Sequence, residues 1–350
     1  MAPYDAFLLV SFGGPEGRAD VLPFLRNVTA GRQVPASRLA DVAEHYYLFD
    51  GISPINSQCR QLLAAIEKDF TASGIDLPVY WGNRNWQPYL ADTIQAMADA
   101  GLRRAIAFVT SGYSSLSSCR QYLDDIDRAR GQVGPQAPQI DKIPPYYRRP
   151  AFVAAFASAA ASALATLPAS VRADADLVFT AHSVPESMAA ASGPAGQAYP
   201  AQLAEVAGLV AARLGRTSWQ LAYSSRSGPP AQPWLGPDVS DALAELARSG
   251  SAGVVLVPIG FVSDHMEVIF DLDVQARQTA DRLGLPIVRA ATPGTDAGFV
   301  AMISDLVRDM QAAGPGPAAN AGGAGAHYFC RENCCGAGPD RSVGLTAAWS

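Results

Sequence analysis

Basic residues are scarce in this sequence, and hydrophobic runs long enough to cross a bilayer with ease are missing. With 26 Lys and Arg against 32 Asp and Glu, the formal net charge is -6. Binding to nucleic-acid phosphates needs a basic surface, so we expect no nucleic-acid partner. The one stretch that resembles a membrane span, residues 151–167, is barely long enough and is rich in Ala and Ser. We therefore expect a packed helix there and no membrane insertion.

Cysteine and histidine are also rare, with five and four residues respectively. The N-terminus lacks the basic segment of a secretory signal, which predicts a cytoplasmic protein. An odd number of cysteines in such a protein favours free thiols or metal ligands over a disulfide framework.

What the sequence does contain is a repeated alternation of short apolar runs and helical patterns. Its 350 residues exceed the size at which single cores stop growing, so two domains are expected. The predicted strands are residues 6–12, 78–82, 105–110, 177–180, 219–223 and 254–259. The second half of the chain repeats the order of the first: a strand, a loop with Trp and Pro, a helix, a strand and then a polar turn. We predict an α/β fold of two similar doubly wound, Rossmann-like parallel-sheet domains with a cleft between them.

The domain boundaries follow from this repeat. Residues 1–147 form a predicted N-terminal Rossmann-like domain, residues 148–298 a C-terminal one, and residues 299–311 a closing helix. Residues 312–326 are almost wholly Ala, Gly, Pro and Asn, the composition of a flexible linker. Residues 312–350 are therefore a predicted linker followed by a Cys-rich tail.

His182 lies between a predicted strand and a predicted helix start. Ser183 and Glu186 have the spacing of a capping box with Ser183 as the N-cap. His182 would then lie at the carboxyl end of a strand, where open α/β sheets bind ligands, beside a helix N-terminus that favours neutral imidazole. Neutral imidazole accepts protons or binds a metal, so we interpret His182 as functional. Packing between strand and helix is the alternative.

Two carboxylates follow the last long strand. On a helix, Glu267, Asp271 and Gln275 fall four residues apart and share one face. A row of polar side chains with two carboxylates that faces a cleft can conduct a divalent cation or accept protons. Asp264 and Glu267 also fit a capping box, which is the structural alternative. Function is favoured because His182 is predicted at the corresponding corner of a neighbouring strand.

The tail holds three cysteines within six residues: Cys330, Cys334 and Cys335. The segment is too polar and too short to bury them by packing alone. Zinc and iron–sulfur sites both remain open; each usually needs four ligands, with His327 or a distant cysteine as the fourth. A reactive tail without metal is the alternative.

Four motifs together resemble the ferrochelatases, class II chelatases that insert ferrous iron into a porphyrin. They are LLVSFGGP at residues 8–15, GISPIN at 51–56, FTAHSVP at 179–185 and GFVSDHMEVIFDLD at 260–273. The four motifs span nearly the whole chain and occur in the right order. Within the family, the chain is most similar to the actinobacterial enzymes. The resemblance implies a chelatase-like fold, Fe²⁺ and coproporphyrin III as substrates, coproheme as product and a [2Fe-2S] cluster as cofactor.

The resemblance also implies roles for individual residues. His182 and Glu267 match the pair that binds Fe²⁺ and accepts protons, and Asp271 would relay protons or metal. The porphyrin-binding positions would be Ser53, Tyr122, Phe12, Arg32 and His45. The cluster ligands would be Cys119, Cys330, Cys334 and Cys335, which leaves Cys59 without a ligand role.

Some positions depart from the pattern of other members. Phe12 replaces a tyrosine that ligates product iron, and Asn85 replaces a histidine. Thr29 and His45 replace arginines that hold propionates. The axial ligand of the product iron and the hold on the propionates are therefore expected to differ in this chain.

The expected chemistry agrees with these residue types. Metallation removes the pyrrole protons and needs a base, an acidic relay and a cleft. The expected partners are the porphyrin, ferrous iron and other enzymes of haem synthesis, and the expected state is a monomer. Two alternatives remain: a ferrochelatase for protoporphyrin IX, and a non-catalytic protein that binds haem or a metal chelate, since carriers also have two α/β lobes around a cleft.

Overall fold

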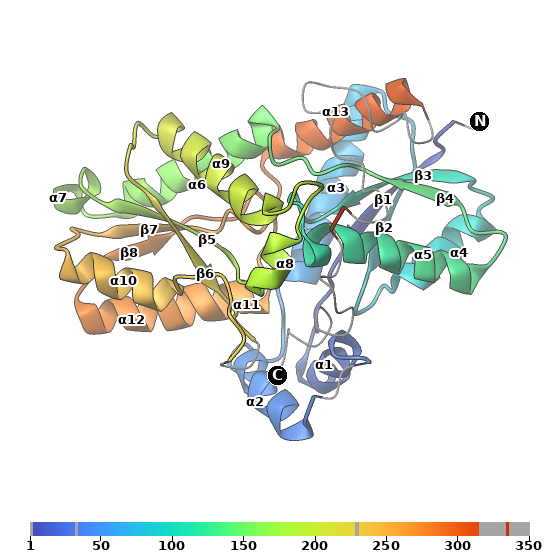
Figure 1. Cartoon of the computed structure of the whole chain (residues 1–350). Helices are drawn as coiled ribbons and strands as arrows, with labels where there is room; N and C mark the ends of the chain where they lie inside the picture. Colours follow the sequence, from blue (N-terminus) through green and yellow to red (C-terminus); the bar gives the residue numbers. More distant parts are fainter. Residues whose placement is uncertain (1–2, 32–33, 228–230, 315–333, 336–350) are drawn as a thin grey trace.

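The computed structural model describes residues 3–31, 34–227, 231–314 and 334–335 and shows two four-stranded parallel sheets (Figure 1). The first has the order β2-β1-β3-β4 and the second β6-β5-β7-β8. The strands of the first sheet are β1 (Ala6–Ser11), β2 (Val79–Asn83), β3 (Arg104–Val109) and β4 (Gln139–Lys142). Those of the second are β5 (Asp176–His182), β6 (Gln220–Ser224), β7 (Val254–Val257) and β8 (Ile287–Arg289). The predicted pair of similar parallel-sheet domains is confirmed.

Helices cover both faces of each sheet (Figure 1). Those of the first lobe are α1 (Val21–Val28), α2 (Ala36–Tyr47), α3 (Ile55–Ser73), α4 (Leu90–Asp99) and α5 (Gln121–Val133), with the short turns η1 (Arg18–Asp20) and η2 (Leu116–Arg120). Those of the second are α6 (Pro150–Thr166), α7 (Ala169–Arg172), α8 (Glu186–Ala190), α9 (Ala198–Arg213), α10 (Val239–Arg248), α11 (Met266–Val268), η3 (Ile269–Gln275) and α12 (Ala276–Leu283), followed by α13 (Ala297–Ala313). Both η2 and η3 are π-helical.

Alternating side chains divide each strand between two cores. In β1, Phe7 joins a large central cluster, whereas Leu8 packs with residues of α4 and α5. In β5, Phe179 joins the same central cluster, whereas Val178 packs with residues of α10 and α12. This period of two is typical of strands buried on both faces. Because one cluster contains Phe7 and Phe179, the two sheets share a continuous apolar core.

The sequence analysis missed two strands, β4 and β8. The residues of β4 are QIDK, and none of them is fully buried. The strand β8 has only three residues, two of them partly exposed. Both lie at an edge of their sheet, where one side lacks a neighbouring strand and the apolar signal weakens. The six predicted strands are confirmed, and each sheet has one more strand than the sequence indicated.

Helix α13 connects the two lobes. It packs against α3 of the first lobe and α6 of the second. Arg149, just before α6, forms an ion pair with Asp309 of α13 at 2.5 Å. The proposed boundary between residues 147 and 148 falls in the loop between β4 and α6. Most of the predicted linker and tail lies outside the described residues.

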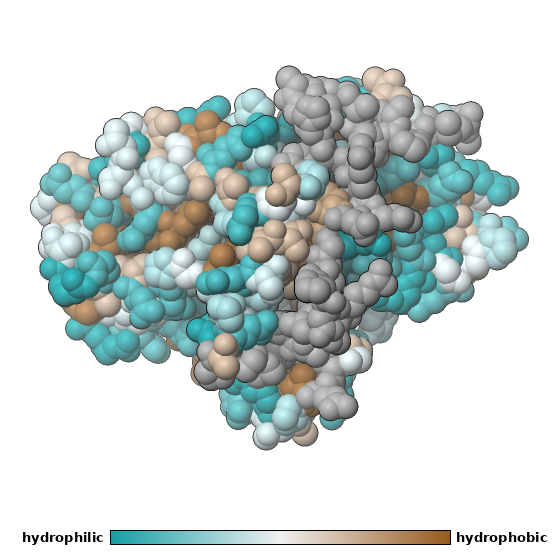
Figure 2. Space-filling model, in the orientation of Figure 1, coloured by the Kyte–Doolittle hydropathy of each residue, from teal (hydrophilic) through white to brown (hydrophobic). Residues whose placement is uncertain are grey.

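Polar and apolar residues are interspersed on the face of the molecule shown in Figure 2, where the hydrophobic ones form small separate patches. The alanine-rich stretch forms α6, which buries Phe152 and Phe156 in the core. Within the described ranges, no helix combines the length and the apolar character that crossing a membrane requires.

Candidate active site

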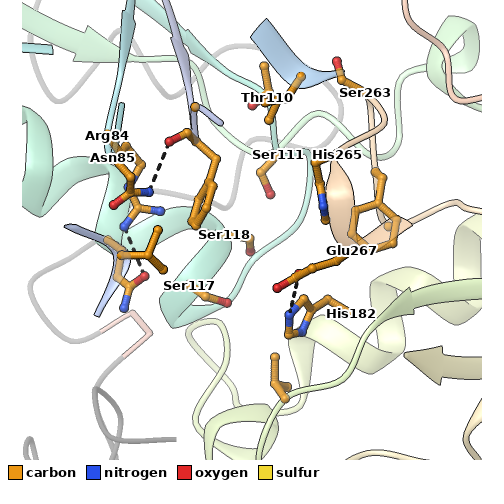
Figure 3. A pocket seen from close by; sticks show the side chains of 18 of the residues that line it. Arg84, Asn85, Thr110, Ser111, Ser117, Ser118, His182, Ser263, His265 and Glu267 are labelled. Carbon is orange, nitrogen blue, oxygen red and sulfur yellow. Dashed lines mark hydrogen bonds and ion pairs between the residues drawn. The ribbon is translucent and has the colours of Figure 1, made fainter. Parts of the chain in front are cut away.

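A cleft lies where the carboxyl ends of strands from both sheets face each other (Figure 3). Its lining includes Phe12 after β1, Arg84 after β2 and Ser111 after β3. The opposite wall includes His182 at the end of β5 and Glu267, which follows β7. Open α/β sheets place ligands at this end of their strands, because the loops there are free to diverge.

His182 and Glu267 lie side by side on this wall and point toward each other (Figure 3). The imidazole Nε2 lies 3.4 Å from Glu267 Oε2. The other ring nitrogen, Nδ1, lies 2.5 Å from the backbone carbonyl oxygen of Ser183. A carbonyl only accepts hydrogen bonds, so Nδ1 carries a proton and Nε2 is the atom presented to Glu267.

The carboxylate of Glu267 controls the protonation of His182. Burial by itself lowers the pKa of His182, but the hydrogen bond and charge of Glu267 and the Ser183 carbonyl outweigh it, so this pKa is raised. Burial raises the pKa of Glu267, but His182 outweighs it and the pKa is lowered. Glu267 thus counteracts the effect of burial on the pKa of His182, and the neutral state of His182 stays a prediction. Helix α8 has only 5 residues, and its dipole acts less strongly than a facing carboxylate.

Neither predicted capping box forms. The N-cap of α8 is Pro185, and Ser183 Oγ instead donates to the carbonyl of Leu235 at 2.7 Å. The N-cap of α11 is His265, and no side-chain hydrogen bond caps that helix. Glu267 is thus free of a capping role and faces His182.

Asp271 lies in η3, beyond Glu267. Its carboxylate accepts a hydrogen bond from Ser225 Oγ. Burial and the nearby charge of Glu267 raise the pKa of Asp271 to about 6, against the lowering effect of Ser225 and His182. The carboxyl group can therefore take up and release protons near neutral pH. Gln275 is exposed, so the predicted polar stripe is reduced to its two carboxylates.

The predicted porphyrin positions have different surroundings. Phe12, Ser53 and Tyr122 line the cleft. His45 is absent from the described lining, and its ring stacks on Phe270 with centroids 3.8 Å apart. Arg32 lies outside the described residues. Contacts of these side chains with a porphyrin stay predictions.

The sequence analysis did not single out Arg84, whose guanidinium lies 4.6 Å from the ring centre of Tyr122 and pairs with Asp125. Its place beside Asn85, after the second strand, was the available signal. His265 also lines the cleft, and burial lowers its pKa. It belongs to the same SDHMEV motif as Glu267, which could have indicated it.

Two lining residues have buried polar atoms that the sequence could not reveal. In the described part of the chain, Trp234 Nε1 and Ser263 Oγ have no hydrogen-bond partner. Leaving such buried groups unpaired costs free energy.

Three of the predicted cluster cysteines come together. Cys119 of η2, Cys334 and Cys335 are buried, and Cys335 interacts electrostatically with both of the others. The Gly193 N–H donates to Cys335 Sγ at 3.3 Å. Cys330 lies outside the described residues, and among those described no group of three His, Cys, Asp or Glu side chains forms a recognisable metal site. Cys59 is buried in α3, where burial raises its pKa to about 11.

Comparisons with known proteins bear on the fold and on the family of this chain. The solved sirohydrochlorin chelatase SirB from Bacillus subtilis subspecies spizizenii, in complex with cobalt, is similar in fold, with a TM-score of 0.52 and 11% identity over 87% of this chain and 94% of that chain. A coproporphyrin III ferrochelatase of Frankia alni is 55% identical over 88% of this chain and 80% of its own length. One of Streptomyces coelicolor is 48% identical over 99% of this chain and 97% of its own length. The ferrochelatase family pattern matches residues 4–311. This chain therefore belongs to the ferrochelatase family.

Proposed function

We propose that this protein inserts ferrous iron into coproporphyrin III to form coproheme in haem biosynthesis. The observation that carries the proposal is the pair His182 and Glu267, 3.4 Å apart in a cleft at the carboxyl ends of both sheets. Membership of the ferrochelatase family supports iron insertion. The names of the Frankia and Streptomyces relatives support coproporphyrin III as the substrate.

The His182 and Glu267 pair suits a divalent cation. Nitrogen and oxygen ligands lie at about 2.0–2.2 Å from a cation of this size. Two donors separated by 3.4 Å can therefore bind one ion together. Because Nδ1 is fixed as a donor to Ser183, Nε2 is the nitrogen that would bind iron after losing its proton. Incoming Fe²⁺ thus competes with a proton for Nε2.

The same residues can remove the pyrrole protons. Insertion of iron expels the protons of the porphyrin nitrogens, and a base must be close to receive them. Glu267 and deprotonated His182 are the nearest candidates on this wall of the cleft. Asp271, with a pKa raised to about 6, can accept protons from that pair and pass them to solvent.

The opposite wall suits a porphyrin with several carboxylates. Phe12 and Tyr122 line it with aromatic rings, and the hydroxyl groups of Ser111, Ser117 and Ser118 belong to the same lining. Coproporphyrin III carries more carboxylates than protoporphyrin IX, so a hydroxyl-rich wall favours it. Ser53, Arg32 and His45 are further proposed contacts for the carboxylates.

We also propose a [2Fe-2S] cluster held by Cys119, Cys330, Cys334 and Cys335. Burial raises the pKa of Cys335 to about 12, so a thiolate there needs a compensating positive charge. The Gly193 N–H directed at its sulfur is the kind of hydrogen bond that cluster thiolates accept. The burial of Cys119, Cys334 and Cys335 and this hydrogen bond support the proposed ligand set. When bound, the cluster would supply a link between the tail and the first lobe, and no step of iron insertion needs its electrons.

Further parts of the proposal concern the setting of the enzyme. It would act as a monomer in the cytoplasm, and other enzymes of haem synthesis would be its partners. The net charge of -6 supports a protein that avoids nucleic acids.

The proposal is tested by multiple turnover. The purified protein is mixed anaerobically with excess Fe²⁺ and coproporphyrin III, and the absorbance of coproheme is followed. An enzyme produces many equivalents of product per chain, whereas a carrier binds no more equivalents of ligand than it has binding sites. Product that never exceeds the protein concentration would contradict the proposed function.

A further inference from the structure

One guanidinium connects both ends of the segment that carries Glu267 and Asp271. Arg289 is the last residue of β8. Its Nη1 donates to Asp264 Oδ1 at 3.0 Å. On the other side, its Nε donates to Asp273 Oδ1 at 2.6 Å and its Nη2 to Asp273 Oδ2 at 2.9 Å. Asp264 precedes α11 and Asp273 lies within η3, so the two ion pairs bracket both carboxylates.

The bracketed segment has a conformation that needs support. The π-helix η3 has 7 residues, and π-helices are rare and occur mostly as single turns within α-helices, frequently at functional sites. The first lobe adds several contacts: Asp264 N–H donates to Gln58 Oε1 of α3 at 2.8 Å, and the ring of Phe270 stacks on His45 of α2. The second lobe holds the segment through the buried side chains of Val268 and Leu272 and the hydrogen bond from Ser225 to Asp271. It also holds the segment through the two ion pairs of Arg289, which the sheet fixes through β7.

The ion pairs of Arg289 with Asp264 and Asp273 have the geometry and burial that stabilise the segment between them. Arg289 binds Asp273 in a bidentate fashion, which fixes direction as well as distance. The side chains of Arg289 and Asp264 are only 17% and 15% exposed, so salt screens their attraction weakly. Such a pair holds its partners in place better than a fully exposed one.

We propose that Arg289 is a positioning residue for metal insertion. It fixes the backbone of residues 264–273 so that Glu267 faces His182 and Asp271 keeps its buried place. Arg289 is not among the described residues that line the cleft, so it acts through this segment and touches neither iron nor porphyrin. The inference rests on the proposed function, because it concerns the same pair of metal ligands.

The first test compares Arg289→Ala with Arg104→Gln. Arg104 is a matched control: its side chain is 9% exposed and pairs with Asp141, but β3 begins there, at the end of the sheet away from the cleft. A misplacement of about 1 Å at a reacting group can cost about 10²-fold in rate, and we expect a loss of kcat of that size in Arg289→Ala. The KM for coproporphyrin III should stay unchanged. Arg104→Gln should lower the melting temperature and leave kcat unchanged.

The second test is chemical rescue. Methylguanidinium added to Arg289→Ala should restore much of the lost kcat, because the vacated site keeps both carboxylates. It should not help His182→Ala or Arg104→Gln. If Arg289→Ala does not fold, Asp273→Asn replaces it in the test and should lower kcat. Adding Arg289→Gln to Asp273→Asn should then lower kcat by less than the product of the two separate effects. Both changes break the same contact, so their effects are not additive.

The outcomes separate the two proposals. A wild-type protein without turnover contradicts the proposed function. An active wild type whose Arg289→Ala variant keeps full kcat, or raises only the KM for porphyrin, overturns the positioning role. A parallel loss of kcat in the Arg289 and Arg104 variants, without rescue by methylguanidinium, overturns it as well, because Arg289 would then be a general structural residue.

Discussion

His182 Nε2 and Glu267 Oε2 lie 3.4 Å apart although they come from different segments of the chain. The topology explains the contact. The order β6-β5-β7-β8 makes β5 and β7 direct neighbours. His182 ends β5, and the turn after β7 leads to α11, which carries Glu267. Two residues that follow parallel neighbouring strands meet at the same edge of the sheet.

Replacing His182 with Ala should abolish iron insertion while the protein stays folded. The change removes both a ligand of iron and a proton acceptor, and loss of a general base typically costs ~10²–10⁴-fold in rate. The measurement is the initial rate of coproheme formation, with circular dichroism and porphyrin binding as controls for folding and cleft integrity. Retention of more than about a tenth of the wild-type rate would be too much for a general base and would contradict the assignment.

Replacing Glu267 with Gln should move the pH dependence of the reaction to lower pH. Neutral His182 is the active form, so the wild-type rate rises as pH increases through its raised pKa. Without the carboxylate, the burial of His182 remains and lowers its pKa, so the rise occurs at lower pH, toward a reduced plateau. The pH profile of kcat/KM measures this shift.

Glu186→Gln is the matched control for that experiment. Glu186 is exposed at the start of α8, and the same chemical change there should leave the profile unchanged. A Glu267→Gln profile that stays in place, or moves to higher pH, would show that Glu267 does not govern the protonation of His182.

Replacing Asp271 with Asn should slow turnover without weakening porphyrin binding. The variant loses the carboxyl group whose pKa is raised to about 6, and with it a proton acceptor beside the metal pair. A loss of kcat of about 10²-fold is expected for a group in proton transfer. Asp281→Asn, on the exposed face of α12, serves as the control. An unchanged kcat in Asp271→Asn would exclude the relay.

The purified protein should be red-brown with a [2Fe-2S] spectrum. Cys119→Ser should remove the colour and lower the melting temperature, because cluster binding adds to the stability of the folded chain. Cys59→Ser is the control for colour, since Cys59 lies in α3 and its replacement should leave the cluster spectrum unchanged. Loss of colour in Cys59→Ser with its retention in Cys119→Ser, or zinc in place of iron in the wild type, would contradict the ligand set.

Much of the fold could be predicted because the central strands have strong signals. All residues of β1, β3 and β7 are buried, and their apolar runs are plain in the sequence. The edge strands β4 and β8 could not be predicted, because their sequences are polar or very short. Their strand conformation depends on pairing with β3 and β7.

The site was predictable as a set of residues but not as an arrangement. The motifs around His182 and Glu267 identified the pair, yet the charge state of His182 depends on a 3.4 Å contact that no sequence spacing gives. The same holds for Arg289, which reaches Asp264 and Asp273 only in the folded chain. Local patterns also favoured capping boxes that tertiary hydrogen bonds replaced, as Ser183 shows.

The most direct test of this account is an anaerobic assay of the wild-type protein with Fe²⁺, run in parallel with coproporphyrin III and with protoporphyrin IX. The two products are followed by their absorbance, and kcat/KM is determined for each porphyrin. We predict repeated turnover of coproporphyrin III with a far higher kcat/KM than for protoporphyrin IX, because the hydroxyl groups of the cleft favour the porphyrin with more carboxylates. Equal specificity constants for the two porphyrins, or binding of both without turnover, would contradict the account.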